Sequence, residues 1–405
     1  MPQTIVLVGF AEAMSAPESV WSLIDARFRV VAFARKGKSS ALRHSKFVHC
    51  HDVCPPEANL EQCLADVQAV MRSTGANANG GQLVLFPLDD KALWISSKAN
   101  LDGSWVLAGA SGAQADLALN KFLQVQAAER AGLDVPKSTL ARSASDLTIY
   151  RGSPELFPII LKAADAVPVR DGHAYSCRKW ICADGSELNR AITEWAERVP
   201  LLVQPFISGN GEGVFGIAAA DGVRAWSGHR RLRMMNPQGS GSSACISESV
   251  PDELKTKIAA MIQETGWRGL FMVELLRARD GKLWFVELNG RPWGSMALCR
   301  AQGLEYPAWH VQLALDENAN AGTNAVTTPG VVSRHAGREF MHILFVIKGA
   351  KSKALSNWPP FWKTLRDVLG IRRRDSFYNW RRDDSKVFLS DFYYTIHSNV
   401  FKGSA

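Results

Sequence analysis

The sequence predicts an α/β fold at the N-terminus, an α+β body behind it, and a basic, aromatic-rich C-terminal extension. Strand-like and helix-like segments alternate along residues 4–86, which is typical of a parallel sheet with crossover helices. Later in the chain, Asp280-Gly281 joins two runs of alternating apolar and polar residues, which indicates an antiparallel hairpin. The charge is also uneven: residues 330–405 hold 14 basic and 6 acidic side chains, whereas residues 1–329 hold 33 of each.

The composition is that of a folded protein with several domains. Of the 405 residues, 46% are hydrophobic and 21% are charged, which excludes collagen-like, coiled-coil and disordered chains. The longest apolar runs fall far short of the roughly 18 residues that cross a bilayer, and the first residues do not resemble a secretion signal. Seven cysteines at irregular spacing do not form a disulfide scaffold. We therefore expect a cytoplasmic protein in a reducing compartment.

The N-terminal segments predict one domain, residues 1–115. Its predicted elements are, in order, strand Thr4–Val8, a helix that ends near Ala26, strand Val30–Ala34, helix Leu60–Arg72 and strand Leu83–Phe86. A dinucleotide site after the first strand is excluded, because Phe10-Ala11-Glu12 stands where the G-x-G-x-x-G pattern requires glycine.

A small cluster of zinc-ligand residue types stands at His49, Cys50, His51 and Cys54. Adjacent residues on an extended segment point to opposite faces, and no second pair follows at zinc-finger spacing. We therefore favour an ordinary loop here, with metal binding as the minor alternative.

A lysine on a buried strand is the first sign of an anion site. Residues 157–163 form an apolar run whose one charged residue is Lys162. Such a lysine carries a large desolvation cost unless an anion lies beside it, and a phosphate would serve. Upstream, a long amphipathic helix ends at Gly132.

A second strand, Leu201–Ile207, runs into a glycine-rich turn at residues 208–213 and returns as residues 214–219. Glycines permit a tight turn or the close approach of a flat ligand to the backbone. On its own, this segment predicts a hairpin.

The Asp280-Gly281 hairpin carries the most specific pattern in the chain. Its two strands place Glu274 near Glu287, and a side-chain period of two puts Glu287 and Asn289 on one face. Two carboxylates and an amide oxygen on one surface are hard ligands suited to Mg²⁺. Arg291 continues the same face and can hold a phosphate or carboxylate through two parallel hydrogen bonds.

In this order, these residues resemble the ATP-grasp superfamily, which includes D-alanine:D-alanine ligase, biotin carboxylase and carbamoyl-phosphate synthase. The resemblance rests on Asn120-Lys121, Ile160-Leu161-Lys162, the Gln204-Pro205-Phe206-Ile207-Ser208-Gly209 stretch, Glu274, and Glu287-x-Asn289-x-Arg291. It implies a two-lobed ATP-grasp domain at residues 116–329, with a lid lobe at about 140–205, behind a Rossmann-like domain. Two positions depart from the usual pattern: Asn120 replaces a common Asp, and Pro205 replaces a common acidic residue.

The resemblance also implies roles for individual residues. Lys121 and Lys162 would neutralise ATP phosphates, and the backbone from Gln204 through Phe206 to Ile207 would hold adenine. Glu212 would bind the ribose. The expected metal ligands, for Mg²⁺ or Mn²⁺, are Glu274, Glu287 and Asn289.

Arg231 and Arg233 belong to the basic segment Gly228–Arg233, which precedes a Gly/Ser-rich loop. If this segment is a strand, both arginines face one cleft and form an anion site for an acylphosphate or a substrate carboxylate. A solvated charge run is the alternative. Together with Arg291, they are the expected catalytic residues. Similar stretches occur in carbamoyl-phosphate-synthase-like ligases, many of which serve peptide, amino-acid or surface-polysaccharide biosynthesis.

We therefore predict an ATP- and Mg²⁺-dependent carboxylate–amine ligase that acts on small-molecule substrates through an acylphosphate and releases ADP and phosphate. One alternative is a carboxylase or carbamoyl-phosphate-synthase-like enzyme that uses bicarbonate. Another is a non-catalytic, nucleotide-binding regulatory protein. An oligomer is compatible with each of them.

Residues 330–405 interleave basic residues with Trp and Phe. The first interpretation is a helical subdomain that packs its aromatic residues on the body. The second is contact with an anionic membrane surface, at the inner face of the membrane, or with an anionic glycan. Nucleic acid ranks last, because no RRM, KH or zinc-finger pattern is present.

Overall fold

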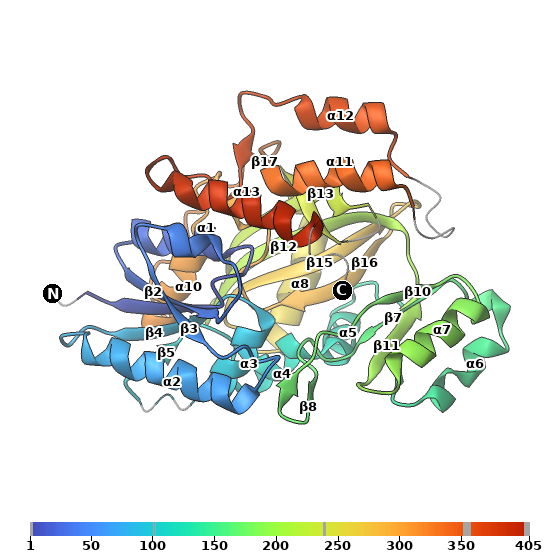
Figure 1. The fold of residues 1–405 in the computed structure, drawn as a ribbon, viewed down its shortest axis with the longest axis horizontal. Coiled ribbons are helices and arrows are strands. Elements are labelled where there is room, and N and C mark those ends of the chain that lie inside the picture. The colour runs from blue at the N-terminus through green and yellow to red at the C-terminus, as the bar shows by residue number, and fades with distance from the viewer. Residues whose placement is uncertain (1–2, 100, 102, 238–239, 351–357, 401–405) are drawn as a thin grey trace.

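The computed structural model describes residues 3–99, 101, 103–237, 240–350 and 358–400 (Figure 1). Lys351 and Lys353 of the basic extension, residues 401–405 and Gly239 of the Gly/Ser-rich loop lie outside the described residues.

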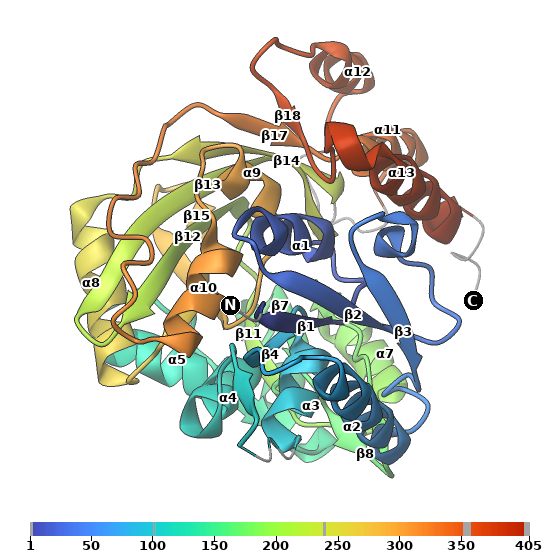
Figure 2. The same ribbon diagram turned by 90° about the vertical axis from the view of Figure 1, so that its left-hand side faces the viewer.

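The N-terminal residues form a parallel five-stranded sheet in the order β3-β2-β1-β4-β5. The strands are β1 Ile5–Gly9, β2 Arg29–Arg35, β3 His49–Val53, β4 Leu83–Pro87 and β5 Trp105–Leu107. The helices are α1 Ala16–Asp25, α2 Leu60–Ala76 and α3 Asp90–Lys98. Alternate residues of β1 face opposite layers: Val6 and Val8 pack with Trp21 of α1, while Ile5 and Leu7 pack with Val67 of α2. The predicted parallel α/β fold is confirmed, and Figure 2 shows helices on both faces of the sheet.

His49, Cys50 and His51 lie on strand β3 rather than in a loop, so the predicted loop is wrong. The backbone there pairs with β2, which fixes an extended conformation. Among the described residues, no group of three or more His, Cys, Asp or Glu side chains could hold a metal ion.

The lid lobe is a four-stranded sheet in the order β10-β7-β11-β6, with its own core around Trp195 and Leu201. Its strands are β6 Thr139–Ala141, β7 Ile159–Ala163, β10 Trp180–Cys182 and β11 Leu201–Pro205, and its main helix is α7 Gly185–Trp195. Two helices, α4 Gly112–Leu119 and α5 Lys121–Arg130, connect it to the N-terminal domain. Asn120 separates them and caps α5, because its Oδ1 accepts a hydrogen bond from the Leu123 N–H at 2.9 Å.

A seven-stranded sheet in the order β16-β15-β12-β13-β14-β17-β18 forms the larger lobe. Its strands are β12 Gly209–Ala219, β13 Gly222–Asn236, β14 Ser240–Glu248, β15 Gly269–Ala278, β16 Leu283–Asn289, β17 Val332–Arg334 and β18 Ser376–Phe377. Helices α8 Asp252–Glu264, α9 Met296–Arg300 and α10 Tyr306–Leu315 accompany it. The predicted hairpin is confirmed, with Gly281 at a φ of +86° in its turn. The predicted glycine-rich turn is wrong, because Gly209, Gly211 and Gly213 lie within β12.

The C-terminal extension is built into this larger lobe. Strand β17 pairs with β14, and β18 pairs with β17. Its helices are α11 Ala336–Lys348, α12 Phe361–Leu369 and α13 Ser385–Val400, and α11 lies against β13 and β14. Tyr378 is buried with its hydroxyl 2.9 Å from the Cys245 Sγ, as the packing interpretation expects. No helix in the described part of the chain is long and apolar enough to cross a membrane.

Candidate functional site

A cleft of about 1170 Å³ lies where the lid sheet meets the large sheet. Predicted site residues from both lobes line it: Lys162, Gln204, Phe206, Ile207, Arg231, Arg233 and Glu274. A smaller cavity of about 500 Å³ beside α10 is lined by none of these residues. These seven residues therefore converge on one cleft, although they come from strands far apart in the chain. The other predicted site residues are not among those that line it: Lys121, Glu212, Glu287, Asn289 and Arg291.

Lys162 lies on β7 and is only 6% exposed. Burial lowers the pKa of its ammonium group to about 8, and the negative charge of Glu287 only partly opposes this effect. Lys121, at the first position of α5, adds a second positive charge that lowers the Lys162 pKa further. A phosphate beside Lys162 would supply the negative charge that favours the protonated form of this lysine.

We expect nucleotide affinity to fall as the pH rises through about 8. A triphosphate binds the protonated lysine, and the lowered pKa means that this proton is lost near pH 8 rather than near its ordinary value. By proton linkage, the Kd for ATP should be about tenfold higher at pH 9 than at pH 7. Isothermal titration calorimetry across this range measures the effect. In Lys162→Met, binding should be weaker at pH 7 and nearly independent of pH; an unchanged slope in this variant would contradict the assignment.

Glu274 and Glu287 face each other across the β15–β16 hairpin, where they are register partners. Asn289 lies two residues beyond Glu287, is 6% exposed, and directs its Nδ2 to the Glu287 Oε1 at 3.4 Å. The three side chains therefore bring two carboxylates and an amide to one face of the sheet, and this donor set fits Mg²⁺.

Glu287 remains ionised in this setting. Burial alone would raise its pKa, but Lys121, Lys179, Lys162 and Arg291 together hold the pKa of this carboxyl well below its usual range. Lys179 was not predicted, because the exposed Arg178-Lys179 pair just before β10 gives no signal until the fold brings the lysine charge near Glu287.

Arg231 forms an ion pair with Glu274, with the Nη2 and Oε1 atoms 2.7 Å apart. Both side chains are largely buried, at 16% and 20% exposed. Gly211 of β12 lies beneath this guanidinium: a Cβ there would stand 2.7 Å from the Arg231 Cδ. The glycine in this strand therefore makes room for the arginine.

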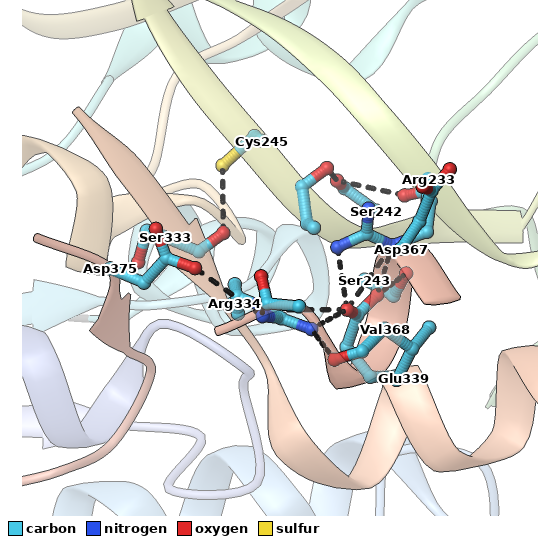
Figure 3. A network of polar contacts seen from close by, with 12 residues as sticks. Arg233, Ser242, Ser243, Cys245, Ser333, Arg334, Glu339, Asp367, Val368 and Asp375 are labelled. Carbon is cyan, nitrogen blue, oxygen red and sulfur yellow. Dashed lines mark hydrogen bonds and ion pairs between the residues drawn. The ribbon is translucent and has the colours of Figure 1, made fainter. Parts of the chain in front are cut away.

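Arg233 lines the same cleft, but its guanidinium is bound by the extension. It donates from Nε to the Glu339 Oε1 at 2.9 Å and from Nη2 to Oε2 at 2.6 Å (Figure 3). These contacts join β13 to α11 and use the Nε and Nη2 donors of Arg233. Its predicted catalytic role stays a prediction.

Arg291 is also engaged within the protein. Its Nε and Nη2 contact the two carboxylate oxygens of Asp90, at the start of α3, at 3.0 and 3.2 Å. Burial alone would lower the pKa of Arg291, but Asp90 prevails and raises it. The predicted bidentate grip is present, but its partner is a carboxylate of the N-terminal domain. Arg291 therefore ties the end of the Glu287–Asn289 strand to that domain, and its predicted catalytic role stays a prediction.

The predicted adenine segment is only partly free to bind. Gln204 is buried and donates from Nε2 to the Ser138 hydroxyl at 2.8 Å, and the Phe206 N–H donates to the Pro158 carbonyl at 2.8 Å. Ile207 lines the cleft and lies between β11 and β12, so its backbone stays the predicted contact for a purine nitrogen.

Glu212 does not line the cleft. Its carboxylate is taken by Arg277 of β15, which approaches both oxygens and donates from Nη2 to Oε2 at 2.9 Å. Arg277 itself lines the cleft. The ribose contact of Glu212 stays a prediction.

The extension supplies one wall of the cleft, and the sequence analysis did not foresee this. His342 of α11, Trp358, and Lys363, Thr364 and Asp367 of α12 line it. The Trp358 indole donates to the Val346 carbonyl at 3.0 Å, which ties this wall to α11. The aromatic run at residues 358–362 was the available signal, but only the fold shows which side of α12 faces the cleft.

A scan against protein-family models finds no match, and a search of curated proteins finds none either. Solved structures do match in fold. An L-amino acid ligase from Bacillus licheniformis aligns with a TM-score of 0.61 at 15% identity, over 82% of this chain and 78% of that one.

Two further structures match to a similar degree. The biotin carboxylase domain of a Hydrogenobacter thermophilus 2-oxoglutarate carboxylase, in complex with MgADP, ADP and bicarbonate, aligns with a TM-score of 0.61 at 15% identity, over 81% of this chain and 73% of that one. An N5-carboxyaminoimidazole ribonucleotide synthetase in complex with ADP aligns with a TM-score of 0.60 at 14% identity, over 91% and 96%. The resemblance is confirmed at the level of fold: the chain has an N-terminal α/β domain followed by the ATP-grasp fold.

Proposed function

We propose that this protein is an ATP- and Mg²⁺-dependent carboxylate–amine ligase. The observation that carries the proposal is the cleft, which brings Lys162 of the lid sheet together with Arg231 and Glu274 of the large sheet. The negative charge of Glu287 also acts on Lys162. The likeness to an L-amino acid ligase supports an amino acid among the substrates. Peptide or surface-polysaccharide biosynthesis is the pathway class we propose, with the cytoplasm as the site of action.

The first step is transfer of the γ-phosphoryl group of ATP to a substrate carboxylate. A carboxylate oxygen of the first substrate attacks the γ-phosphorus of ATP, the bond to the β-phosphate oxygen breaks, and ADP leaves. Lys162 and Lys121 balance the negative charge on the transferred group, and Glu274, Glu287 and Asn289 would hold Mg²⁺. When bound, the metal would neutralise part of the negative charge on the phosphates.

In the second step, the amine nitrogen attacks the acyl carbon of the acylphosphate. Phosphate leaves with the electron pair of the C–O bond, the nitrogen loses a proton, and an amide forms. Arg231 lines the cleft beside Glu274, and its guanidinium would hold the leaving phosphate there.

Product analysis tests this route. The protein is incubated with ATP, Mg²⁺ and a panel of amino acids and organic acids, and we expect ADP and phosphate in amounts equal to the amide formed. With an ¹⁸O-labelled carboxylate, one label should appear in the phosphate. Release of AMP and pyrophosphate would rule out the acylphosphate route.

Two other outcomes would favour the remaining candidates. ATP turnover that requires bicarbonate, and no amine, would indicate a carboxylase-type reaction, to which the likeness to the biotin carboxylase domain points. Tight ADP binding with no turnover across the panel would indicate a regulatory nucleotide-binding protein.

A further inference from the structure

Helix α12 has two faces with different surroundings. Lys363, Thr364 and Asp367 face the cleft. On the other side, Trp362 and Leu369 are among the most exposed large apolar residues described, at 77% and 68%. The Arg366 side chain between them is 79% exposed, and its Nε lies 3.7 Å from the Asp367 Oδ1 at the edge of this face. The positions 362, 366 and 369 follow helical spacing and form one outward stripe.

The segment after the helix continues this surface. Ile371 is 61% exposed, and Arg372, Arg373 and Arg374 are exposed beside it. The nearest acid along the chain, Asp375, is already engaged, because its carboxylate is 3.3 Å from the buried Arg334 and accepts a hydrogen bond from the Arg372 backbone N–H at 3.2 Å. Figures 1 and 2 show α12 at the outer edge of the molecule, beyond α11. We call the stripe and this segment, Trp362, Arg366, Leu369 and Ile371–Arg374, the α12 surface.

We propose that the α12 surface docks on an anionic lipid bilayer. A bilayer interface accepts an indole ring and aliphatic side chains at the depth of the headgroups, while arginines beside them bind the headgroup phosphates. The α12 surface presents this combination, with Trp, Leu and Ile between four arginines.

The charges and apolar side chains of the α12 surface disfavour a second copy of the chain and nucleic acid as binding partners. In a symmetric dimer through this surface, the four arginines would face or adjoin their copies, which is repulsive. Nucleic acid would satisfy the arginines, but it would leave Leu369 and Ile371 without an apolar environment. An anionic bilayer satisfies both kinds of side chain.

Vesicle co-sedimentation of the full chain tests the proposal. We expect binding to phosphatidylcholine vesicles that contain phosphatidylglycerol, and little binding to vesicles of phosphatidylcholine alone. Each arginine near an anionic surface contributes roughly fivefold to partitioning, so Arg372→Gln/Arg373→Gln/Arg374→Gln should lower it about a hundredfold. Trp362→Ser/Leu369→Ser should also lose binding.

A control variant in the lid lobe shows whether any loss of vesicle binding is specific to the α12 surface. Ile149→Ser/Arg190→Gln changes an equally exposed apolar residue and an exposed arginine of the lid lobe, and it should bind vesicles like the wild type. Because the arginine variant changes only exposed side chains, it remains informative if the apolar variant fails to fold. Wild-type vesicle binding in both α12 variants would overturn the proposal. So would binding to a DNA oligonucleotide in place of vesicles, or a dimer in sedimentation velocity that the variants dissociate.

Discussion

Glu287→Gln is expected to lower the rate of ATP-dependent turnover about 10²- to 10³-fold, the range seen when one preorganised electrostatic group is removed from an active site. The substitution preserves shape but removes the negative charge on which four cations converge: Lys121, Lys162, Lys179 and Arg291. It also removes one of two carboxylates available to Mg²⁺. A second effect follows, since Glu287 is the largest factor that keeps Lys162 protonated: the Lys162 pKa should fall below about 8.

The measurement is steady-state ADP release at several Mg²⁺ concentrations, with calorimetric titration of ADP in the presence of Mg²⁺ or EDTA. The variant should need more Mg²⁺ for half-maximal turnover. Its affinity for ADP should differ little between Mg²⁺ and EDTA, whereas the wild type should bind ADP more tightly with Mg²⁺. Glu264→Gln, at the exposed end of α8 beside Arg130, removes the same charge far from the cleft and should turn over like the wild type. Thermal melts confirm that each variant is folded under assay conditions. Turnover within a few-fold of wild type for Glu287→Gln would remove this residue from the metal site.

The sequence could predict the hairpin that carries this residue because its pattern is local. A turn signal at Asp280-Gly281 and a period of two place Glu274 opposite Glu287, and the structure has this register. The same local argument put Arg231 and Arg233 on one strand lining one cleft.

The sequence could not predict which acids these arginines meet. Arg291 contacts Asp90, which lies 201 residues earlier, and Arg233 contacts Glu339, which lies 106 residues later. Glu212 and Arg277 likewise meet only because β12 pairs with β15. A polar side chain on a predicted face can bind a ligand or another part of the protein, and only tertiary placement distinguishes the two outcomes.

The positive charge excess in residues 330–405 is not all at the surface. Part of this charge is buried, because Arg334 is 3% exposed and lies between Glu339 and Asp375. The extension closes one side of the cleft through Trp358 and Lys363, so the part of the chain that holds the positive charge also shapes the candidate active site.

Glu339→Gln is expected to destabilise the protein by about 3–5 kcal/mol, the cost of removing one partner from a buried ion pair. The Glu339 carboxylate is 3% exposed and accepts hydrogen bonds from Arg233, from Arg334 through Nη2 at 2.9 Å, and from the Ser243 hydroxyl at 2.8 Å (Figure 3). The substitution leaves the buried Arg334 with Asp375, and the partly buried Arg233 with the charge of Asp367, as their remaining acidic neighbours.

Urea unfolding followed by circular dichroism measures this loss, and the matched control is Asp383→Asn. Asp383 belongs to the same extension and also pairs with an arginine, Arg381, but at the surface, where an ion pair adds little. We expect the control to unfold with the wild-type midpoint and Glu339→Gln to unfold at a clearly lower urea concentration. Because Arg233, His342 and Trp358 line the cleft, the KM for ATP should rise in the same variant while it is still folded. A wild-type midpoint for Glu339→Gln would show that the network does not hold the extension, and that α11 is retained by its apolar contacts alone.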